Sequence, residues 1–250
     1  MEFLVSIITP SYNSARFIQQ SVESVMSQTY NKWEMIIVDD SSYDNSKEII
    51  NSLCKKDARI KSVFLEKNIG PARARNLGIQ KSSGKYIAFL DSDDLWDPYK
   101  LEKQISFMED NNIAFSYTAY QSISEDGNTR YSIIKAPDVI TYHDYLKNTI
   151  IGCLTVVLDR SKIGNLEMPD IRSSHDMAFW LLILKRGFYA YGLNENLASY
   201  RLVGDSNSSN KIKAAKDVWR VYRNIEKLNL FYSFWCFVHY IFYAFKKRIL

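Results

Sequence analysis

A short apolar segment that ends in a cluster of carboxylates constrains this chain more than any other feature. Residues 86–90 are all apolar or aromatic and predict a buried β-strand, and residues 91–94 (Asp-Ser-Asp-Asp) follow where it leaves the sheet. Asp91 and Asp93 point the same way if the extended backbone continues. Two converging carboxylates favour a hard divalent ion between them, shared with a substrate phosphate. The alternative interpretation is that the acids only cap a helix predicted over residues 96–108.

Strands and helices alternate through the first 90 residues. The patterns predict strands at residues 3–9, 33–38, 60–65 and 86–90, with helices at residues 14–28, 46–55 and 70–82. This order implies βαβ crossovers and a mostly parallel sheet. Ligands bind beyond the carboxyl ends of the strands in such sheets. We therefore expect three strand ends, followed by residues 10–13, 39–42 and 91–94, to meet at one cleft.

The second half of the chain is less regular. Residues 114–122 and 128–135 predict a β-hairpin around an Asp-Gly-Asn turn, and residues 154–159 predict another strand. An apolar helix is predicted over residues 176–185, ending at Gly187. Residues 206–213 are polar and predicted to be mobile, and residues 216–228 form an amphipathic pattern that leads into an aromatic tail.

Charge and cysteine usage indicate the compartment. Residues 211–250 hold nine Lys or Arg and two acids, a net +7, which leaves −3 for the rest because the whole chain carries +4. A basic tail suggests an anionic surface as partner. The three cysteines, Cys54, Cys153 and Cys236, form no ligand pattern and fit a reducing compartment. The amino terminus has no secretory signal pattern, so we expect the catalytic part to stay inside the cell.

Four segments occur in an order that resembles the family 2 glycosyltransferases with a GT-A fold. They are residues 5–13 (VSIITPSYN), 36–42 (IIVDDSS), 68–76 (NIGPARARN) and 91–94 (DSDD). Each is weak alone, but the four in order are specific, and the likeness covers about residues 3–210. It is closest to bacterial teichuronic acid, O-antigen and capsular polysaccharide transferases. The resemblance implies an α/β, Rossmann-like nucleotide-diphospho-sugar transferase, with a mostly parallel sheet flanked by helices and with C-terminal amphipathic and aromatic helices.

The resemblance also implies a division of the chain and of the reaction. Residues 1–110 would bind the nucleotide sugar, residues 111–210 the acceptor, and residues 211–250 would form a basic, aromatic helical tail. The expected enzyme is a metal-dependent, inverting hexosyl- or N-acetylhexosaminyl-transferase that uses a nucleotide-diphosphate donor, most simply a UDP-sugar. The expected acceptor is a lipid-linked glycan, and no nucleic-acid partner is expected.

Donor-site residues follow by position within the resembling segments. The first loop would lie against the base through Pro10, Tyr12 and Asn13, and Asp39 would accept a hydrogen bond from the base edge. Asp91 would contact the ribose, with Ser92 beside it, and Asp93 would bind Mn²⁺ or Mg²⁺. The ion would stabilise the leaving diphosphate. Arg75, or its neighbour Arg73, and Arg201 are the candidates for contacting or closing over that diphosphate.

An inverting transferase needs a base for the acceptor hydroxyl, and the resemblance assigns this role to Asp176. An aspartate is ionised at neutral pH without special tuning. Its alternative role is that of an ordinary acid in the first turn of a helix. Trp180 is expected in the core rather than against a sugar. The family more often has Glu where this chain has His175, which leaves three roles open for that residue: tuning Asp176, contacting the acceptor or capping the helix.

The carboxyl-terminal tail predicts a peripheral location on the inner face of the cell membrane. Residues 230–245 carry no formal charge, and nine of these 16 residues are aromatic. A helix of this length spans about 24 Å, short of the roughly 30 Å hydrocarbon core, so a simple span is not expected. The aromatic residues suit the interface, and the basic residues 246–248 suit anionic headgroups. The alternative is that the aromatic residues pack on the catalytic domain or on a second subunit.

Two other functions remain as alternatives. The segment FLDSD at residues 89–93 resembles the nucleophile strand of haloacid-dehalogenase-type phosphatases, although those enzymes carry it on the first strand and follow it with Gly-Thr. A non-catalytic, membrane-associated subunit with the same fold is the second alternative, suggested by His175.

Overall fold

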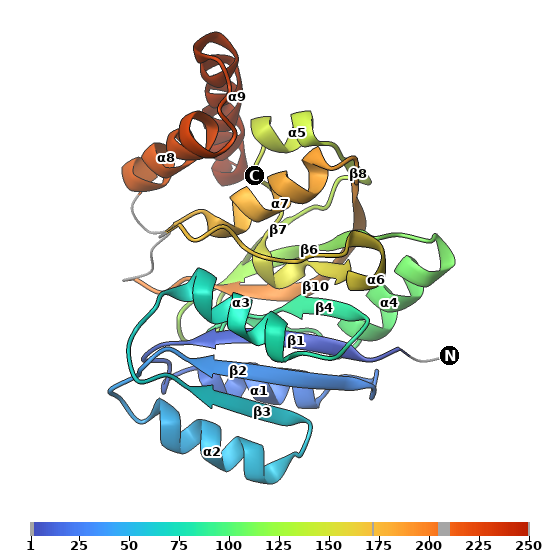
Figure 1. Ribbon diagram of the computed structural model, residues 1–250, viewed down its shortest axis with the longest axis vertical. Helices are drawn as coiled ribbons and strands as arrows, with labels where there is room; N and C mark the ends of the chain where they lie inside the picture. Colours follow the sequence, from blue (N-terminus) through green and yellow to red (C-terminus); the bar gives the residue numbers. More distant parts are fainter. Residues whose placement is uncertain (1–2, 172, 205–210, 250) are drawn as a thin grey trace.

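Four parallel strands form one side of a mixed sheet in the computed structural model, which describes residues 3–171, 173–204 and 211–249. They are β1 (Val5–Ser11), β2 (Trp33–Asp39), β3 (Ile60–Phe64) and β4 (Tyr86–Phe89), in the spatial order β3-β2-β1-β4. The crossovers between them contain α1 (Ile18–Met26), α2 (Ser46–Lys56) and α3 (Pro71–Lys81) (Figure 1). The predicted βαβ order of this half is confirmed.

The first strand runs through Pro10 instead of stopping before it. The β1–β4 pairing ends at Ile8, whose carbonyl accepts a hydrogen bond from Leu90 N at 3.1 Å. Backbone groups alternate in direction along a strand, so the nitrogen of Pro10 faces this same side, where β4 has already ended. Proline is tolerated there because no donor is needed. The strand therefore continues to Ser11, paired with β2 alone.

The second half extends the same sheet in the order β4-β9-β6-β10-β5. Its strands are β5 (Leu95–Trp96), β6 (Phe115–Ile123), β7 (Arg130–Ile134), β8 (Val139–Ile140), β9 (Val157–Asp159) and β10 (Ala190–Arg201). The helices are α4 (Lys100–Asp110), α5 (Tyr142–Lys147), the 3₁₀ turn η1 (Cys153–Thr155), α6 (Arg160–Ile163) and α7 (His175–Lys185). Strand β9 is antiparallel to both β4 and β6, so the sheet is mixed at this point.

The predicted hairpin is confirmed as the antiparallel β6–β7 pair, and the apolar helix as α7. The helix predicted from residue 96 is shorter, because Leu95 and Trp96 form β5 and α4 begins at Lys100. Tyr99 is its N-cap residue, with no side-chain capping bond, so the interpretation of residues 91–94 as a helix cap is wrong. Strand β10 was not predicted; its register with β6 shifts at Leu193–Asn196 and again before Ser199, which breaks the alternation of side chains.

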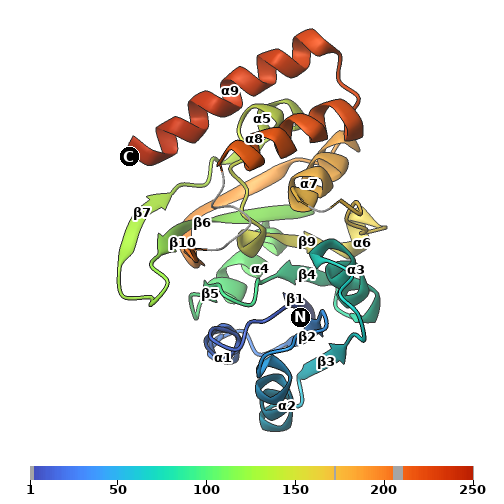
Figure 2. The same ribbon diagram turned by 90° about the vertical axis from the view of Figure 1, so that its left-hand side faces the viewer.

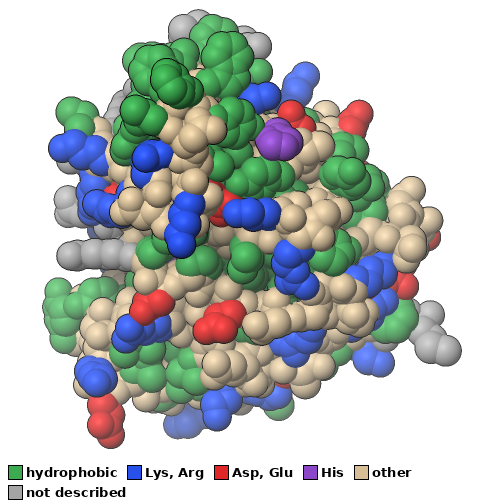
Figure 3. Space-filling view, turned by 45° about the horizontal axis from the view of Figure 1, so that its top comes forward, with side chains coloured by type: hydrophobic (Ala, Val, Ile, Leu, Met, Phe, Trp, Pro, Cys, Tyr) green, Lys and Arg blue, Asp and Glu red, His purple; other side chains and the backbone are tan. Residues whose placement is uncertain are grey.

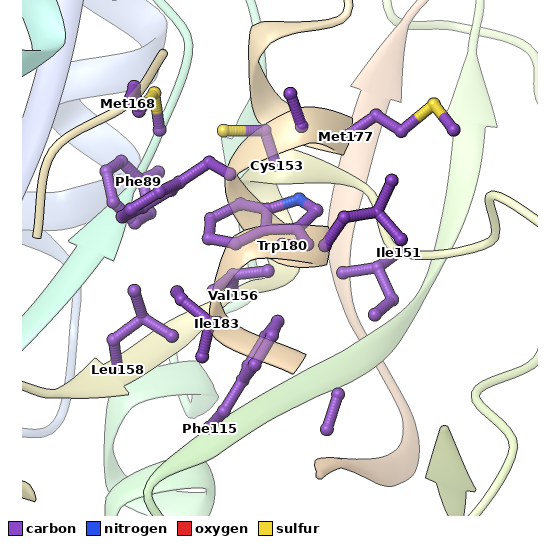
Figure 4. Close-up of a cluster of buried hydrophobic side chains, with 14 of the residues drawn as sticks. Phe89, Phe115, Ile151, Cys153, Val156, Leu158, Met168, Met177, Trp180 and Ile183 are labelled. Atoms are coloured by element: carbon purple, nitrogen blue, oxygen red, sulfur yellow. The ribbon is translucent and has the colours of Figure 1, made fainter. Parts of the chain in front are cut away.

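An aromatic cluster holds α7 against the sheet. Trp180 is fully buried, as predicted, and its ring centroid lies 5.6 Å from that of Phe89 on β4 and 5.4 Å from that of Phe115 on β6 (Figure 4). Such ring pairs add about 0.5–1.5 kcal/mol each to the burial of apolar area. This packing fixes the amino-terminal end of α7 relative to the end of β4.

Two helical segments follow the sheet at the carboxyl terminus. Helix α8 (Lys211–Arg220) passes into the π-helical turn η2 (Val221–Ile225), and α9 (Leu230–Ile249) lies beside α8 (Figure 2). The amphipathic helix predicted at residues 216–228 is thus divided between α8 and η2, and the polar residues 206–210 lie outside the described residues. The fully buried Ser233 and Cys236 lie on α9, which packs against α5. None of the helices in the described part of the chain combines the length and hydropathy that a membrane span needs.

Candidate active site

The loops after β1 and β2 are joined by hydrogen bonds at the carboxyl edge of the sheet. Asn13, in the left-handed region with φ of 51°, donates its backbone N–H to Ser42 Oγ at 2.9 Å and accepts from Tyr43 N at 3.0 Å. Asp39 is fully buried and accepts from Ser42 N and Ser42 Oγ at 3.0 and 2.6 Å. The half-exposed Tyr12 ring lies edge-on to Tyr43. Together with Pro10 at the end of β1, these residues form one wall of the edge.

The second aspartate of this pair anchors the next segment. Asp40 accepts from Ile69 N at 2.7 Å and from Gly70 N at 2.8 Å, immediately before α3. Gly70 has φ of +88°, a conformation that residues with a side chain rarely adopt. Asp40 thereby fixes the start of α3, which carries Arg75 one turn further on. The sequence analysis predicts a role for Asp39 only. The structural role of Asp40 is one that the adjacent pair of aspartates could have indicated.

Arg75 is the charged group that joins the two halves of the site. Its guanidinium is buried and forms an ion pair with Asp91 at the end of β4, while Nη1 contacts His175 Nε2 on α7 at 2.5 Å. Burial opposes its charge, but the attraction of Asp91 together with the other acidic groups nearby outweighs burial and raises the pKa of Arg75 above its ordinary value. Arg73 instead forms an exposed ion pair with Asp170 at 2.5 Å, so Arg75 is the one of the two predicted arginines that reaches the strand end.

The Arg75 contact defines the protonation state of His175. A guanidinium can only donate, so Nε2 must accept and the proton of the neutral ring lies on Nδ1. Burial, and then the Arg75 charge, lower the pKa of His175. Its Nδ1 is buried and has no hydrogen-bond partner among the described residues. His175 is the first residue of α7 and does not cap it, because the N-cap residue is Ser174, with φ of 56° and no side-chain capping bond.

Asp176 lies next to His175 in the first turn of α7. Its Oδ1 accepts from Met177 N at 2.8 Å, which leaves the second carboxylate oxygen for other contacts. Its charge acts on Arg75 and on His175, so these groups lie within a common electrostatic field. Asp91, Arg75, His175 and Asp176 are therefore gathered at one place, although they come from β4, α3 and α7.

Asp93 and Asp94 differ in environment. Burial and the neighbouring Asp91 charge raise the pKa of Asp93 to about 6. Asp94 is almost fully buried, and burial together with the charges of Asp93 and Asp91 raises its pKa well above the ordinary range. Asp94 Oδ1 accepts from Arg201 N at 2.9 Å, and its Oδ2 has no partner in the described part of the chain. Asp94 thus connects residues 91–94, which we call the acidic turn, to β10.

Arg201 uses its guanidinium on the protein itself. Its Nε donates to the Asp93 carbonyl at 2.8 Å, Nη1 to the Glu125 carbonyl at 2.7 Å and Nη2 to Gln20 Oε1 at 2.8 Å. The side chain is 2% exposed. In this arrangement Arg201 holds the backbone of the acidic turn, rather than closing over a bound diphosphate as the sequence had suggested. The sequence around Arg201, at the end of a strand and beside a polar loop, does not indicate that its side chain binds the backbone of residues 91–94.

The acidic turn fits a divalent ion that is shared with a ligand. The described residues contain no group of three or more His, Cys, Asp or Glu side chains placed to hold an ion alone. Among them, no cationic side chain forms an ion pair with Asp93. Burial and a neighbouring negative charge make the ionised form of a carboxyl group less stable, and a bound cation restores the stability of that form. The remaining coordination positions would have to come from phosphate oxygens and water, as hard ions accept.

Comparison with known proteins identifies the family. The profile described as "Glycosyl transferase family 2" matches residues 6–163, more than half of the chain. The chain belongs to this family. It is 53% identical over 98% of both chains to TuaG of Bacillus subtilis (strain 168), whose name assigns it to teichuronic acid biosynthesis as a glycosyltransferase. It is 44% identical, over 88% of this chain and 85% of the relative, to the Escherichia coli UDP-Glc:alpha-D-GlcNAc-diphosphoundecaprenol beta-1,3-glucosyltransferase WfgD.

Solved structures agree on the fold of the transferase. S. aureus TarS 1-349 in complex with UDP-GlcNAc matches with a TM-score of 0.72 at 20% identity, over 88% of this chain and 65% of that one. This chain thus spans just under two thirds of the length of that structure. The predicted GT-A fold and the predicted family of bacterial polysaccharide transferases are confirmed. The protein is a glycosyltransferase, so neither the phosphatase nor the non-catalytic alternative is supported.

Proposed function

We propose that this enzyme transfers a sugar from a UDP-sugar to a lipid-linked glycan, with inversion at the anomeric carbon and with Mn²⁺ or Mg²⁺, in bacterial surface polysaccharide synthesis. The observation that carries the proposal is the Arg75 contact, which brings Asp91 at the end of β4 next to the start of α7, where Asp176 lies. A donor-binding group and a proton acceptor are needed at the same place for such a transfer. Residues 1–110 would then act on the donor and residues 111–210 on the acceptor.

Donor recognition is proposed for the wall at the carboxyl edge. The exposed face of Tyr12 suits a planar base, with Pro10 and Asn13 shaping the loop beneath it. Asp39 would accept from an N–H on the base edge; its rigid hold by Ser42 supports a specific contact. Asp91 would accept from a ribose hydroxyl, with Ser92 beside it, and the ion pair with Arg75 orients the Asp91 carboxylate.

The acidic turn is proposed to hold the diphosphate through Asp93. A bound divalent ion would supply positive charge to the departing nucleoside diphosphate. Asp93 would bind it, and Arg201 acts as a positioning residue, because its bond to the Asp93 carbonyl fixes the backbone of the turn. In the described part of the chain, Arg75 is the cationic side chain that pairs with Asp91, and it would offset phosphate charge.

Asp176 is proposed as the base. Its carboxylate would accept the proton of the acceptor hydroxyl as that oxygen attacks the anomeric carbon from the face opposite the diphosphate. Asp176 lies in the first turn of α7, where the helix dipole favours a negative charge. The name of the Escherichia coli relative supports a UDP-sugar donor and a diphosphate-linked lipid acceptor. The Mn²⁺ complex of a mannosyltransferase from Pyrobaculum calidifontis, with a TM-score of 0.71 and 16% identity, is consistent with the metal.

A donor screen tests this proposal. The purified enzyme is incubated with Mn²⁺, a panel of UDP-, GDP- and dTDP-sugars and a lipid-diphosphate-linked N-acetylhexosamine acceptor. We expect one UDP-sugar to be consumed, with release of UDP and, by NMR, a product whose anomeric configuration is opposite to that of the donor. Retention of configuration would contradict the mechanism, and consumption of a GDP- or dTDP-sugar alone would contradict the donor assignment.

The outer face of α9 supports the proposal that the enzyme associates peripherally with the inner face of the cell membrane, whose surface is anionic. Large apolar side chains recur along this face at helical spacing, and Phe231 is 89% exposed. The exposed members are Leu230, Phe231, Phe234, Trp235, Val238, Ile241, Phe242 and Phe245. Figure 3 shows hydrophobic side chains gathered at the top of the molecule, where α8 and α9 lie, with basic side chains around them. An amphipathic helix of this kind lies in the plane of the interface.

Sedimentation with anionic liposomes at low salt tests the membrane association. We expect the full chain to pellet with the liposomes, and the triple variant Phe231→Ser, Trp235→Ser, Phe242→Ser to remain largely in the supernatant. The matched control is the double variant Tyr131→Ser, Ile133→Ser. It removes two apolar side chains from β7, each of which is about half exposed. If the unmodified chain stays in the supernatant, the membrane assignment fails.

A further inference from the structure

An apolar groove runs between α8 and α9, next to the outward face of α9, with which it shares Phe234, Ile241 and Phe245. It has a volume of about 810 Å³. Trp219 on α8 faces Phe237 on α9, with their ring centroids 5.3 Å apart. Ile212, Ile241 and Phe245 continue the apolar lining. This volume is within the range of sites that take a whole small molecule.

Small side chains keep the groove open. Ala215 on α8 and Ala244 on α9 both line it, although larger apolar residues at these positions would fill the space between two helices. An open groove of this kind leaves apolar surface in water, which is unfavourable by about 25 cal/mol for each Å². Ligand sites are typically concave and mostly apolar, as this groove is, and they occur between helices.

The charge of the groove narrows the ligand to an amphiphile. Lys216 is the one charged side chain that lines the groove within the described residues, and it is exposed. A purely apolar partner would gain nothing from it, whereas a ligand with an anionic head and a hydrocarbon chain would use both parts. A diphosphate attached to an isoprenoid chain has this distribution of charge.

The location of the groove links it to the candidate active site. Helix α8 follows β10 after nine residues, and β10 ends with Arg201, which holds the Asp93 backbone. In Figure 1 the parallel strands β1, β2 and β3 point to the left, so their carboxyl ends lie on that side of the molecule. Figure 2 views the molecule from that side, and α8 and α9 lie above the strand ends. A chain seated in the groove would therefore be attached to a head group on the same side as the acidic turn.

We propose that the groove between α8 and α9 binds the isoprenoid chain of the acceptor lipid, with Lys216 next to its diphosphate. The proposal rests on the lipid-linked acceptor of the proposed function and adds a chain-binding site to it. It gives α9 two adjacent roles: its outward face for the membrane surface, and the groove beside that face for a single lipid chain withdrawn from the membrane.

Calorimetry with farnesyl diphosphate tests the groove directly. The titration uses the full chain with saturating UDP and Mn²⁺, so that the diphosphate cannot enter the donor site. We expect saturable binding of farnesyl diphosphate and none of inorganic diphosphate. Ala244→Trp should weaken binding at least about tenfold by filling the groove, whereas Val238→Trp, which adds the same ring to α9 outside the groove lining, should not. Ala215→Leu is the milder filling variant if circular dichroism shows that Ala244→Trp is misfolded.

A charge variant tests the place of the head group. Lys216→Glu should weaken farnesyl diphosphate binding about fivefold to tenfold and leave farnesol binding unchanged; Lys56→Glu on α2 is the matched control. Absence of saturable binding, or equal affinity in Ala244→Trp, would overturn the proposal. A dimer that dissociates in Ala244→Trp, seen by sedimentation velocity, would assign the groove to a second copy and would overturn it too. Transfer to a soluble acceptor without a lipid chain tests the proposed function separately, because it does not need the groove.

Discussion

Asp176→Asn should abolish glycosyl transfer and leave nucleotide binding intact. The amide has the size of the carboxylate and can still accept from Met177 N, so α7 should keep its start, but it cannot take up the proton of the acceptor hydroxyl. General bases contribute about 10²–10⁴ in rate, so we expect kcat to fall by about 10³. Steady-state transfer rates and UDP affinity by calorimetry, measured on the same preparation, check both halves of this expectation.

Asp170→Asn is the matched control for Asp176→Asn. It removes a carboxylate just before α7 that pairs with Arg73 on the surface. An exposed pair of this kind contributes little to stability, and its loss should leave kcat within about twofold. Near-normal turnover of Asp176→Asn would remove this residue from the mechanism. Equal losses in both variants would show that a change of charge, rather than a lost base, is responsible.

Asp93→Ala should remove the metal-dependent part of UDP binding. We expect the affinity for UDP with Mn²⁺ to fall about 100-fold, to the value that the unmodified enzyme shows with EDTA, because the proposed ion has lost its protein ligand. Calorimetry of the two proteins, each with and without EDTA, forms a complete cycle. The expected result is that EDTA has no further effect on the variant.

Asp97→Asn controls for the loss of an acid from the same segment. Asp97 accepts from Tyr99 N near the start of α4 and lies outside the acidic turn. Its replacement should leave the metal dependence unchanged. Equal UDP affinity of the unmodified enzyme with and without EDTA would contradict the proposed ion bridge, whatever the Asp93 variant does.

The parallel half of the fold was predictable because its local signals agree with its tertiary structure. Residues 33–38 are a run of apolar residues around one Glu, and this residue, Glu34, is itself buried against Lys61 and Ser6. Three of the four strands of this half lead into turn or acidic residues, at positions 10–13, 39–42 and 91–94, and these residues indicate the edge of the site. Parallel strands are buried on both faces, so hydrophobic runs identify them without knowledge of their neighbours.

Strand β10 shows why the second half of the chain was harder to predict. Leu193 and Asn196 lie on either side of a register shift, so no alternation of apolar and polar residues spans the strand. The partners of Arg201 are also distant in sequence, since Gln20 and Glu125 are 181 and 76 residues away. Contacts of this kind have no local pattern. The same is true of Arg75 and His175, which are 100 residues apart.

The position of Trp180 has a consequence for how this enzyme varies. Trp180 is four residues after Asp176, so the two lie on the same side of α7, one turn apart. Helix α7 has no side-chain cap at its start. The Arg75–His175 contact and the rings of Phe89 and Phe115 packed on Trp180 therefore maintain the register of its first turn. Random mutagenesis that selects for altered turnover should recover substitutions among these buried rings, far from any sugar, and warming should reduce turnover before the chain unfolds.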